Sequence, residues 1–104
     1  VYNFSGSSNL VMYKDVIFDM SRDEVKYQDN HVELTKNESK ILTVLLENRE
    51  KIVTREEIIT ALWQSDNFID ENTLSVNINR LRSKLKSIGI DEFITTKKGK
   101  GYIV

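Results

Sequence analysis

One stretch of the chain restricts the possible folds more than any other, because the apolar residues between positions 74 and 88 recur with the period of an α-helix. On a wheel of about 100° per residue, five apolar side chains fall within one narrow sector: Leu74, Ile78, Leu81, Leu85 and Ile88. A helix with one apolar stripe buries that stripe against other elements. The chain must therefore supply further helices or a sheet to cover it.

The remaining surface of this helix carries hydrogen-bonding groups of a particular kind. Beside the apolar sector, at i, i+4, i+7 and i+11, lie Thr73, Asn77, Arg80 and Lys84. Val76 lies opposite the leucines, so one aliphatic group stands among polar ones on a face that a core does not use. A reader of the DNA major groove needs Arg for guanine, Asn for adenine, and Thr or a methyl-bearing group for thymine. The alternative for Arg80 is an ordinary solvated helix arginine.

A basic hairpin follows this helix. Three cations, Lys97, Lys98 and Lys100, are interleaved with Gly99 and Gly101. Charged residues also protect exposed strand edges from pairing, which is the alternative explanation for the lysines. The two glycines favour a tight turn and a close backbone approach to a ligand.

The formal net charge of −1 hides two unlike parts of the chain. Residues 1 to 79 contain 8 Lys/Arg and 14 Asp/Glu, net −6, whereas residues 80 to 104 contain 7 and 2, net +5. Basic charge gathered in one region is what a one-sided contact with a polyanion requires. Lys and Arg also favour the last turns of helices, so charge alone does not decide between the two explanations.

Composition excludes several other classes of protein. With 104 residues, no Cys, no Pro and 39% hydrophobic residues, the chain has the balance of one small soluble domain. It contains no apolar run of membrane-spanning length and no secretory signal, so we expect a cytoplasmic protein with no membrane partner. The single His31 and the scattered carboxylates offer no metal-ligand spacing, no converging catalytic set and no cofactor site. We therefore expect neither an enzyme nor a metalloprotein.

The first third of the chain alternates short β-forming runs with polar turns. Residues 1 to 9 are Ser/Gly-rich and predict a tail or linker that something precedes, followed by one domain over residues 10 to 104. The pattern predicts four antiparallel strands: Leu10–Tyr13, Val16–Asp19, Glu24–Tyr27 and His31–Leu34.

Two capping signals mark the next two helices. Thr35 with Glu38, and Thr54 with Glu57, match the Thr-x-x-Glu capping box. The expected buried residues of the first helix are Ile41, Leu42, Leu45 and Leu46. Those of the second are Ile58, Ile59, Leu62 and Trp63, with Trp63 interpreted as a core anchor rather than a stacking platform for nucleic acid.

The third helix and the hairpin complete the predicted order. Asp70 or Asn72 caps a helix that runs to about Ser87, and Gly89 stops it. Residues 93 to 96 then pair with residues 101 to 104, and Tyr102 packs the hairpin against the third helix. The fold class is therefore α+β: a winged helix-turn-helix with an N-terminal four-stranded antiparallel sheet, three helices and a C-terminal β-hairpin wing.

Four motifs in this order resemble the OmpR/PhoB family of response-regulator effector domains, over about residues 10 to 104. They are Leu34 to Glu38, Thr54 to Ile58 with Leu62-Trp63, Thr73 to Arg82, and Thr96 to Tyr102. The resemblance implies a transcription factor that binds double-stranded DNA at tandem direct repeats. It also implies an N-terminal receiver domain, absent from this chain, that a sensor histidine kinase phosphorylates.

The resemblance also implies roles for individual residues. Base-reading and phosphate-contacting positions of the family fall on Thr73, Val76, Asn77, Arg80 and Arg82, and the basic residue of the wing falls on Lys98. A loop that can contact RNA polymerase falls on Gln64, Ser65, Asp66, Asn67 and Phe68. The segments 72 to 82 and 97 to 102 look most like the subgroup of low-GC Gram-positive regulators that responds to bacitracin or antimicrobial peptides.

Three departures from the family pattern and several alternatives remain. Asn72 replaces a frequent Arg, Asn77 a frequent His, and Lys98 a common Arg; Lys lacks the planar fork of Arg. For Arg82, a phosphate contact and an ion pair with the sheet are equally compatible with its position. The competing function is a winged-helix protein-interaction module. We expect the isolated domain to be monomeric and to pair only on DNA.

Overall fold

The computed structural model describes residues 10 to 64 and 70 to 104. The predicted tail and most of the predicted polymerase loop lie outside these residues. Within them the predicted α+β winged-helix fold is confirmed: a four-stranded sheet, three helices and a C-terminal hairpin follow one another along the chain. None of the described helices is both long enough and apolar enough to cross a membrane.

The N-terminal sheet is an antiparallel meander with the strand order β1-β2-β3-β4. Its strands are β1 (Leu10–Tyr13), β2 (Val16–Asp19), β3 (Glu24–Tyr27) and β4 (Asn30–Glu33). The fourth strand begins and ends one residue earlier than predicted. Alternate residues face the core, so Val16, Phe18 and Val25 are buried on one face.

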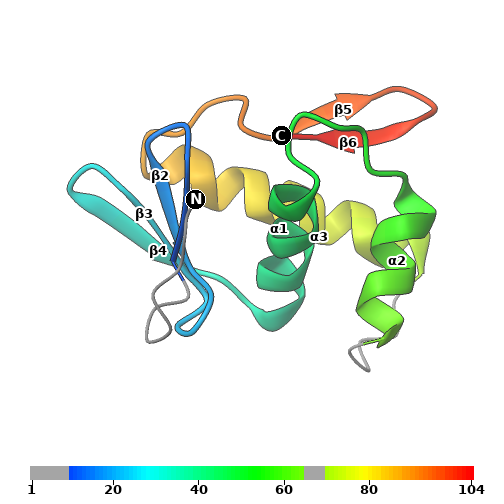
Figure 1. Ribbon diagram of the computed structural model, residues 1–104, viewed down its shortest axis with the longest axis horizontal. Coiled ribbons are helices and arrows are strands. Elements are labelled where there is room, and N and C mark those ends of the chain that lie inside the picture. The colour runs from blue at the N-terminus through cyan, green and yellow to red at the C-terminus, as the bar shows by residue number, and fades with distance from the viewer. Residues whose placement is uncertain (1–9, 65–69) are drawn as a thin grey trace.

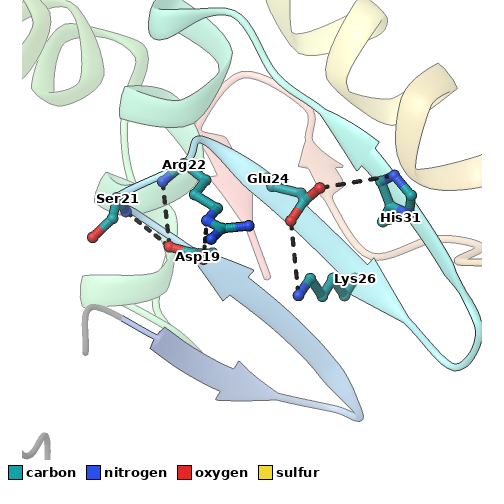
Figure 2. A network of polar contacts seen from close by, with 6 residues as sticks. All are labelled: Asp19, Ser21, Arg22, Glu24, Lys26 and His31. Carbon is teal, nitrogen blue, oxygen red and sulfur yellow. Dashed lines mark hydrogen bonds and ion pairs between the residues drawn. The ribbon is translucent and has the colours of Figure 1, made fainter. Parts of the chain in front are cut away.

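The opposite face of this sheet carries the exposed apolar residues Leu10 and Met12 together with ion pairs (Figure 2). The Glu24 carboxylate lies 3.8 Å from Lys26 Nζ and 3.8 Å from His31 Nε2. In the turn after β2, Asp19 Oδ1 accepts the backbone N–H groups of Ser21 and Arg22. Because ion pairs at a protein surface contribute little free energy, these contacts add little to the stability of the sheet.

Helix α1 (Lys36–Glu47) and helix α2 (Arg55–Gln64) both begin at the predicted capping boxes. At α1 the Thr35 backbone N–H donates to Glu38 Oε1 at 2.9 Å, and the Glu38 N–H donates to Thr35 Oγ1 at 3.2 Å. The pair Thr54 and Glu57 repeats the arrangement at 2.9 and 3.1 Å. Each box satisfies two amides that would otherwise have no helical partner.

The prediction that Trp63 anchors the core is wrong. Ile58 and Leu62 are fully buried, but the Trp63 side chain is 53% exposed. Trp63 follows Leu62 by one residue and therefore lies about 100° away from it around α2. The buried sector of this ten-residue helix is too narrow to include both.

Helix α3 (Glu71–Ser87) begins at Asp70, the first of the two predicted caps. The Thr73 N–H donates to Asp70 Oδ1 at 2.7 Å. This hydrogen bond holds the pKa of the Asp70 carboxyl below its ordinary value of 3.8, because the ionised form accepts it better. The helix ends at Ile88, and Gly89 follows with φ +100°. All five residues of its apolar stripe are buried.

The C-terminal hairpin consists of β5 (Thr95–Lys97) and β6 (Gly101–Ile103). The first strand was predicted to start at Phe93, but Phe93 and Ile94 are both buried and precede it. Consecutive burial is incompatible with the alternation of a two-sided strand. The hairpin is tied to the segment before α2 by two hydrogen bonds between the backbones of Val53 and Tyr102, at 2.8 and 2.9 Å.

Helix α1 lies in the middle of the molecule (Figure 1). The four-stranded sheet is at one end of the molecule, and the hairpin and α2 are toward the other. The long helix α3 spans the distance between them and packs against α1 and α2. Apolar residues of α3 are thus buried along the length of the helix, and the side of α3 that faces away from them is not covered by α1 or α2.

Candidate nucleic-acid interface

The outer face of α3 is polar with one exposed aliphatic group at its centre. Val76 is 46% exposed, although 22 other hydrophobic residues in the described part of the chain are buried. Its exposed neighbours on the same face are Asn72, Asn79, Arg80 and Ser83. Val76, Arg80 and Ser83 also line a shallow depression together with Asn79 and Lys84. We call the five residues Asn72, Val76, Asn79, Arg80 and Ser83 the outer face of α3.

Asn77 does not belong to this face, contrary to the predicted outward orientation. Its side chain is 6% exposed, and its Nδ2 donates to the Thr73 carbonyl oxygen at 2.8 Å. The physical reason is that α3 is covered by two helices, whose combined contact is wider than the leucine stripe alone. A flanking residue about 60° from the centre of that stripe is then also enclosed.

Lys84 is likewise turned toward the protein. Its Nζ lies 2.6 Å from Oε1 of Glu38, a carboxylate in the first turn of α1 that is only 1% exposed. The sequence placed Lys84 in the outward polar stripe, because nothing local reveals a partner 46 residues earlier. The structure instead directs its charge toward α1.

Thr73 and Arg80, the other two residues of the predicted stripe, differ in their exposure. Thr73 is half-buried in the first turn of α3, where its amide is held by Asp70 and its carbonyl by Asn77. Arg80 is exposed beside Val76. Of the four residues in the predicted stripe, Arg80 alone is therefore a cation directed away from the core.

Arg82 joins α3 to the hairpin. Its Nε donates to the Ile94 carbonyl oxygen at 3.2 Å, its Nη2 donates to Thr96 Oγ1, and its guanidinium lies 5.9 Å from the centroid of the Tyr102 ring. Arg82 thus contacts a carbonyl oxygen, a hydroxyl and an aromatic ring rather than the carboxylate that the predicted ion pair with the sheet requires. Tyr102 is 6% exposed beneath this guanidinium, in keeping with the predicted packing of the hairpin against α3.

The tip of the hairpin carries the three predicted cations. Lys97, Lys98 and Lys100 are all exposed, and the Lys100 N–H closes the turn on the Lys97 carbonyl oxygen at 2.8 Å. Gly99 occupies this turn with φ +75°, a conformation that other residues rarely adopt. The turn presents ammonium groups on a short, fixed ribbon.

Two residues of the outer face were missed by the sequence reasoning. Asn79 and Ser83 lie next to Val76 and Arg80 and are exposed. Their signal was present in the sequence as the i+3 and i+7 spacing from Val76, which places them on its side of the wheel. Both are hydrogen-bonding side chains of a kind that can reach a base edge or a phosphate.

The predicted polymerase loop is only partly described. Gln64 ends α2 and is exposed, whereas Ser65, Asp66, Asn67 and Phe68 lie outside the described residues. In the ranges 10 to 64 and 70 to 104, no group of three or more metal-ligating side chains comes together.

Comparison of the sequence with known proteins identifies transcriptional regulators as its relatives. Residues 29 to 104 match the family model described as "Transcriptional regulatory protein, C terminal". The response regulator protein GraR of Staphylococcus aureus (strain MRSA252) is 43% identical over 104 residues, which is 99% of this chain and 46% of that protein. GraR of Staphylococcus saprophyticus is 44% identical over the same length. The chain thus spans about half the length of the curated relatives it matches.

Solved structures agree with the sequence comparison. The C-terminal domain of the nisin resistance regulator NsrR, a lantibiotic response regulator, superposes with a TM-score of 0.81 at 37% identity, covering 88% of this chain and 93% of that one. The DNA-binding domain of the response regulator AdeR, solved in complex with an intercistronic region, gives a TM-score of 0.76 at 25% identity over 89% and 95% of the two chains.

Proposed function

This chain belongs to the OmpR/PhoB-type C-terminal DNA-binding domains, the effector domains of two-component response regulators that control transcription, and from that membership we propose how it binds DNA. The outer face of α3 enters the major groove, where Val76 and Arg80 contact base edges. The hairpin tip, with Lys97, Lys98 and Lys100, contacts the adjacent backbone or minor groove. The family is one of binding domains rather than enzymes.

The observation that carries this proposal is the exposure of Val76 beside Arg80 on a helix whose other aliphatic residues are buried. A valine that stays exposed to solvent adds little hydrophobic free energy to folding, whereas its methyl groups can contact the methyl group of thymine in the major groove. Arg80 supplies the donor pair that guanine O6 and N7 accept.

The two parts of the surface have different tasks. Phosphate contacts fix position and add affinity, whereas base contacts discriminate between sequences. The hairpin lysines are point charges without the planar fork of arginine, so we assign them to the phosphate contacts. Arg82 donates hydrogen bonds to Ile94 and Thr96 and thereby keeps the hairpin at a fixed position relative to α3.

The test compares Arg80→Ala with Lys98→Ala on a cognate site, identified by selection from randomised duplexes, and on random DNA. We expect Arg80→Ala to cost about 1–3 kcal/mol on the cognate site and to relax one base position. We expect Lys98→Ala to weaken binding to both duplexes by similar factors. Arg22→Ala and Lys26→Ala, at exposed cations in the turn after β2 and on β3, are the matched controls, and we expect both to leave binding unchanged. Equal losses from Arg80→Ala on cognate and random DNA would contradict the division of tasks.

The proposal extends to the arrangement on DNA. The domain is monomeric in solution and pairs on tandem direct repeats, where linkage through neighbouring sites raises the effective concentration. Analytical ultracentrifugation with and without a two-site duplex tests this arrangement. A stable dimer without DNA would refute it.

Further partners follow from family membership. In the intact cytoplasmic protein, an N-terminal receiver domain phosphorylated by a histidine kinase controls this domain. The segment that starts at Gln64 contacts RNA polymerase; the exposure of the neighbouring Trp63 supports this surface. Trp63→Ala is expected to reduce activated transcription in vitro without reducing DNA binding, and an equal loss of both would remove the support.

The signal to which the intact regulator responds is a cell-envelope antibiotic or antimicrobial peptide. Support comes from the similarity to the lantibiotic response regulator NsrR and to GraR. A transcription reporter under the cognate site, exposed to nisin in cells with and without the regulator, tests it. A response of equal size in both strains would exclude this class of signal.

A further inference from the structure

Few polar side chains are buried in the described part of the chain, and their positions are unusual. They are Glu38, Ser39 and Asn77. Two adjacent ones stand at the start of α1, and the third lies on α3. A buried carboxylate without a partner is costly, so Glu38 requires a compensating charge.

Lys84 supplies that charge from α3. Its Nζ lies 2.6 Å from Glu38 Oε1, and the same oxygen accepts the Thr35 N–H at 2.9 Å. Among the described residues, Lys84 is the one cation recorded within ion-pair distance of Glu38. Since Lys84 is about one-third exposed, the pair lies at the boundary between the core and the surface beside α3.

The neighbouring Ser39 links the same turn of α1 to the four-stranded sheet. Its Oγ donates to Asp23 Oδ1 at 2.6 Å, and Asp23 also accepts the Leu34 N–H through its carbonyl oxygen. The first turn of α1 is therefore bonded to the sheet through Ser39 and to α3 through Glu38. A rotation of α3 about its own axis would break the second of these links.

We infer that Glu38 and Lys84 are a positioning pair for DNA recognition, which fixes the rotation of α3 and withholds the charge of Lys84 from DNA phosphates. Apolar stripes tolerate small rotations, because van der Waals contacts can be exchanged, whereas a rotation that moved Lys84 away would leave the buried Glu38 carboxylate without its compensating charge. The pair lies on the flank of α3, so it determines the angle at which Val76 and Arg80 face outward. The inference rests on the proposed DNA binding by this face.

The inference differs measurably from a role of Lys84 as a phosphate contact. Each neutralised phosphate contributes about 0.9 to the slope of log affinity against log salt concentration. A phosphate-contacting Lys84 would add that amount, whereas a lysine engaged with Glu38 adds nothing. Removing Glu38 would free the ammonium for DNA.

The experiment measures fluorescence anisotropy on cognate and random duplexes over a series of salt concentrations. We expect Lys84→Met, which keeps the aliphatic stem, to leave the slope unchanged and to lower the ratio of cognate to random affinity by roughly 5-fold or more, the loss expected when one base contact is misaligned. We expect Glu38→Gln to raise affinity for random DNA and to steepen the slope by about 0.9. Lys98→Met is the matched control and makes the slope shallower by about 0.9.

The double variant E38Q/K84Q guards against loss of folding. It restores an uncharged hydrogen bond between the two positions, and we expect it to recover a cognate-to-random ratio closer to the wild-type value than either single change. A shallower slope for Lys84→Met with an unchanged affinity ratio would overturn the inference and leave the proposed function intact. A wild-type domain that binds neither duplex would overturn the proposed function itself.

Discussion

Val76 and Leu81 illustrate how one helix assigns opposite tasks to aliphatic residues. Leu81 is fully buried, and Val76 is 46% exposed. Burial of a leucine contributes about 2 kcal/mol to folding, whereas an exposed valine contributes little. We therefore expect Val76 to contribute to the free energy of binding in a complex rather than to the stability of the free domain.

Val76→Ala tests this difference between folding and binding. We expect the free energy of unfolding in urea to change by less than about 0.5 kcal/mol, because the side chain has few protein contacts to lose. Affinity for the selected cognate duplex falls, and discrimination at one thymine position is reduced, because a methyl contact is removed. Met12→Ala, at a 71% exposed residue of the sheet, is the control that leaves both quantities unchanged. If the variant bound the cognate duplex as tightly as the wild type, Val76 would not be a base contact.

The sequence predicted single residues well where their environment is local and poorly where it is not. The apolar stripe of α3 is buried as predicted, because it depends only on helical period. Asn77 and Lys84 were misplaced, because their orientation depends on the helices packed against α3, and Lys84 pairs with a carboxylate 46 residues away. Trp63 was misplaced because a strongly apolar residue type was given more weight than its angle on α2.

At the scale of elements, the ends of the helices follow from capping chemistry. Thr35, Thr54 and Asp70 each accept or exchange hydrogen bonds with the residue three positions later. These interactions span one turn, so the sequence contains all the information they need. Strand ends depend on which residues find partners and on burial from both sides, which explains the shifts at β4 and β5.

The cap of α3 gives a prediction about pH. The folded protein holds the pKa of Asp70 below 3.8, so the ionised carboxylate stabilises the fold at higher pH. This contribution is lost as the pH falls from the ordinary value through the lowered one. We expect Asp70→Asn to keep the cap while reducing the loss of thermal stability over that acid range, as followed by circular dichroism. Asp70→Ala loses the cap at every pH, and an acid profile of Asp70→Asn identical to that of the wild type would contradict the assignment.

The hairpin gives a second prediction at this scale. A Cβ on Gly101 would collide with the Val53 carbonyl oxygen, and the backbone there is held by the pairing with Tyr102. We expect Gly101→Ala to lower the free energy of unfolding in urea by about 3 kcal/mol, from this overlap and the strained φ together. Gly99→Ala is the matched control: its Cβ meets nothing within 4 Å, so only backbone strain of about 1 kcal/mol applies. Equal losses would show that the close approach to Val53 is unimportant.

At the scale of the whole molecule, positive and negative charge are separated along the chain. The segment with net +5 forms the C-terminal part of α3 and the hairpin, while the acidic segment supplies the sheet, α1, α2 and the start of α3. The net charge of −1 therefore does not oppose binding to a polyanion, because the field near the hairpin tip is set by its own lysines.

This separation predicts a steep dependence of DNA affinity on salt. We expect cations near the outer face of α3 and in the hairpin to contact roughly 4 to 6 phosphates. The slope of log affinity against log salt concentration is then about −4 to −5 for each bound domain, because counterions are released at every neutralised phosphate. The slope is measured on random duplex, where base contacts contribute least, and the domain is retained on heparin until moderate salt is applied. Substituting Lys97, Lys98 and Lys100 together by Gln should make the slope shallower by about 2 to 3. Substituting Lys14, Lys26 and Lys40, which lie in the turn after β1, on β3 and on α1, removes the same number of charges and serves as the control. If both triple variants changed the slope equally, net charge rather than its position would govern binding, and the hairpin would lose its assigned place on the DNA.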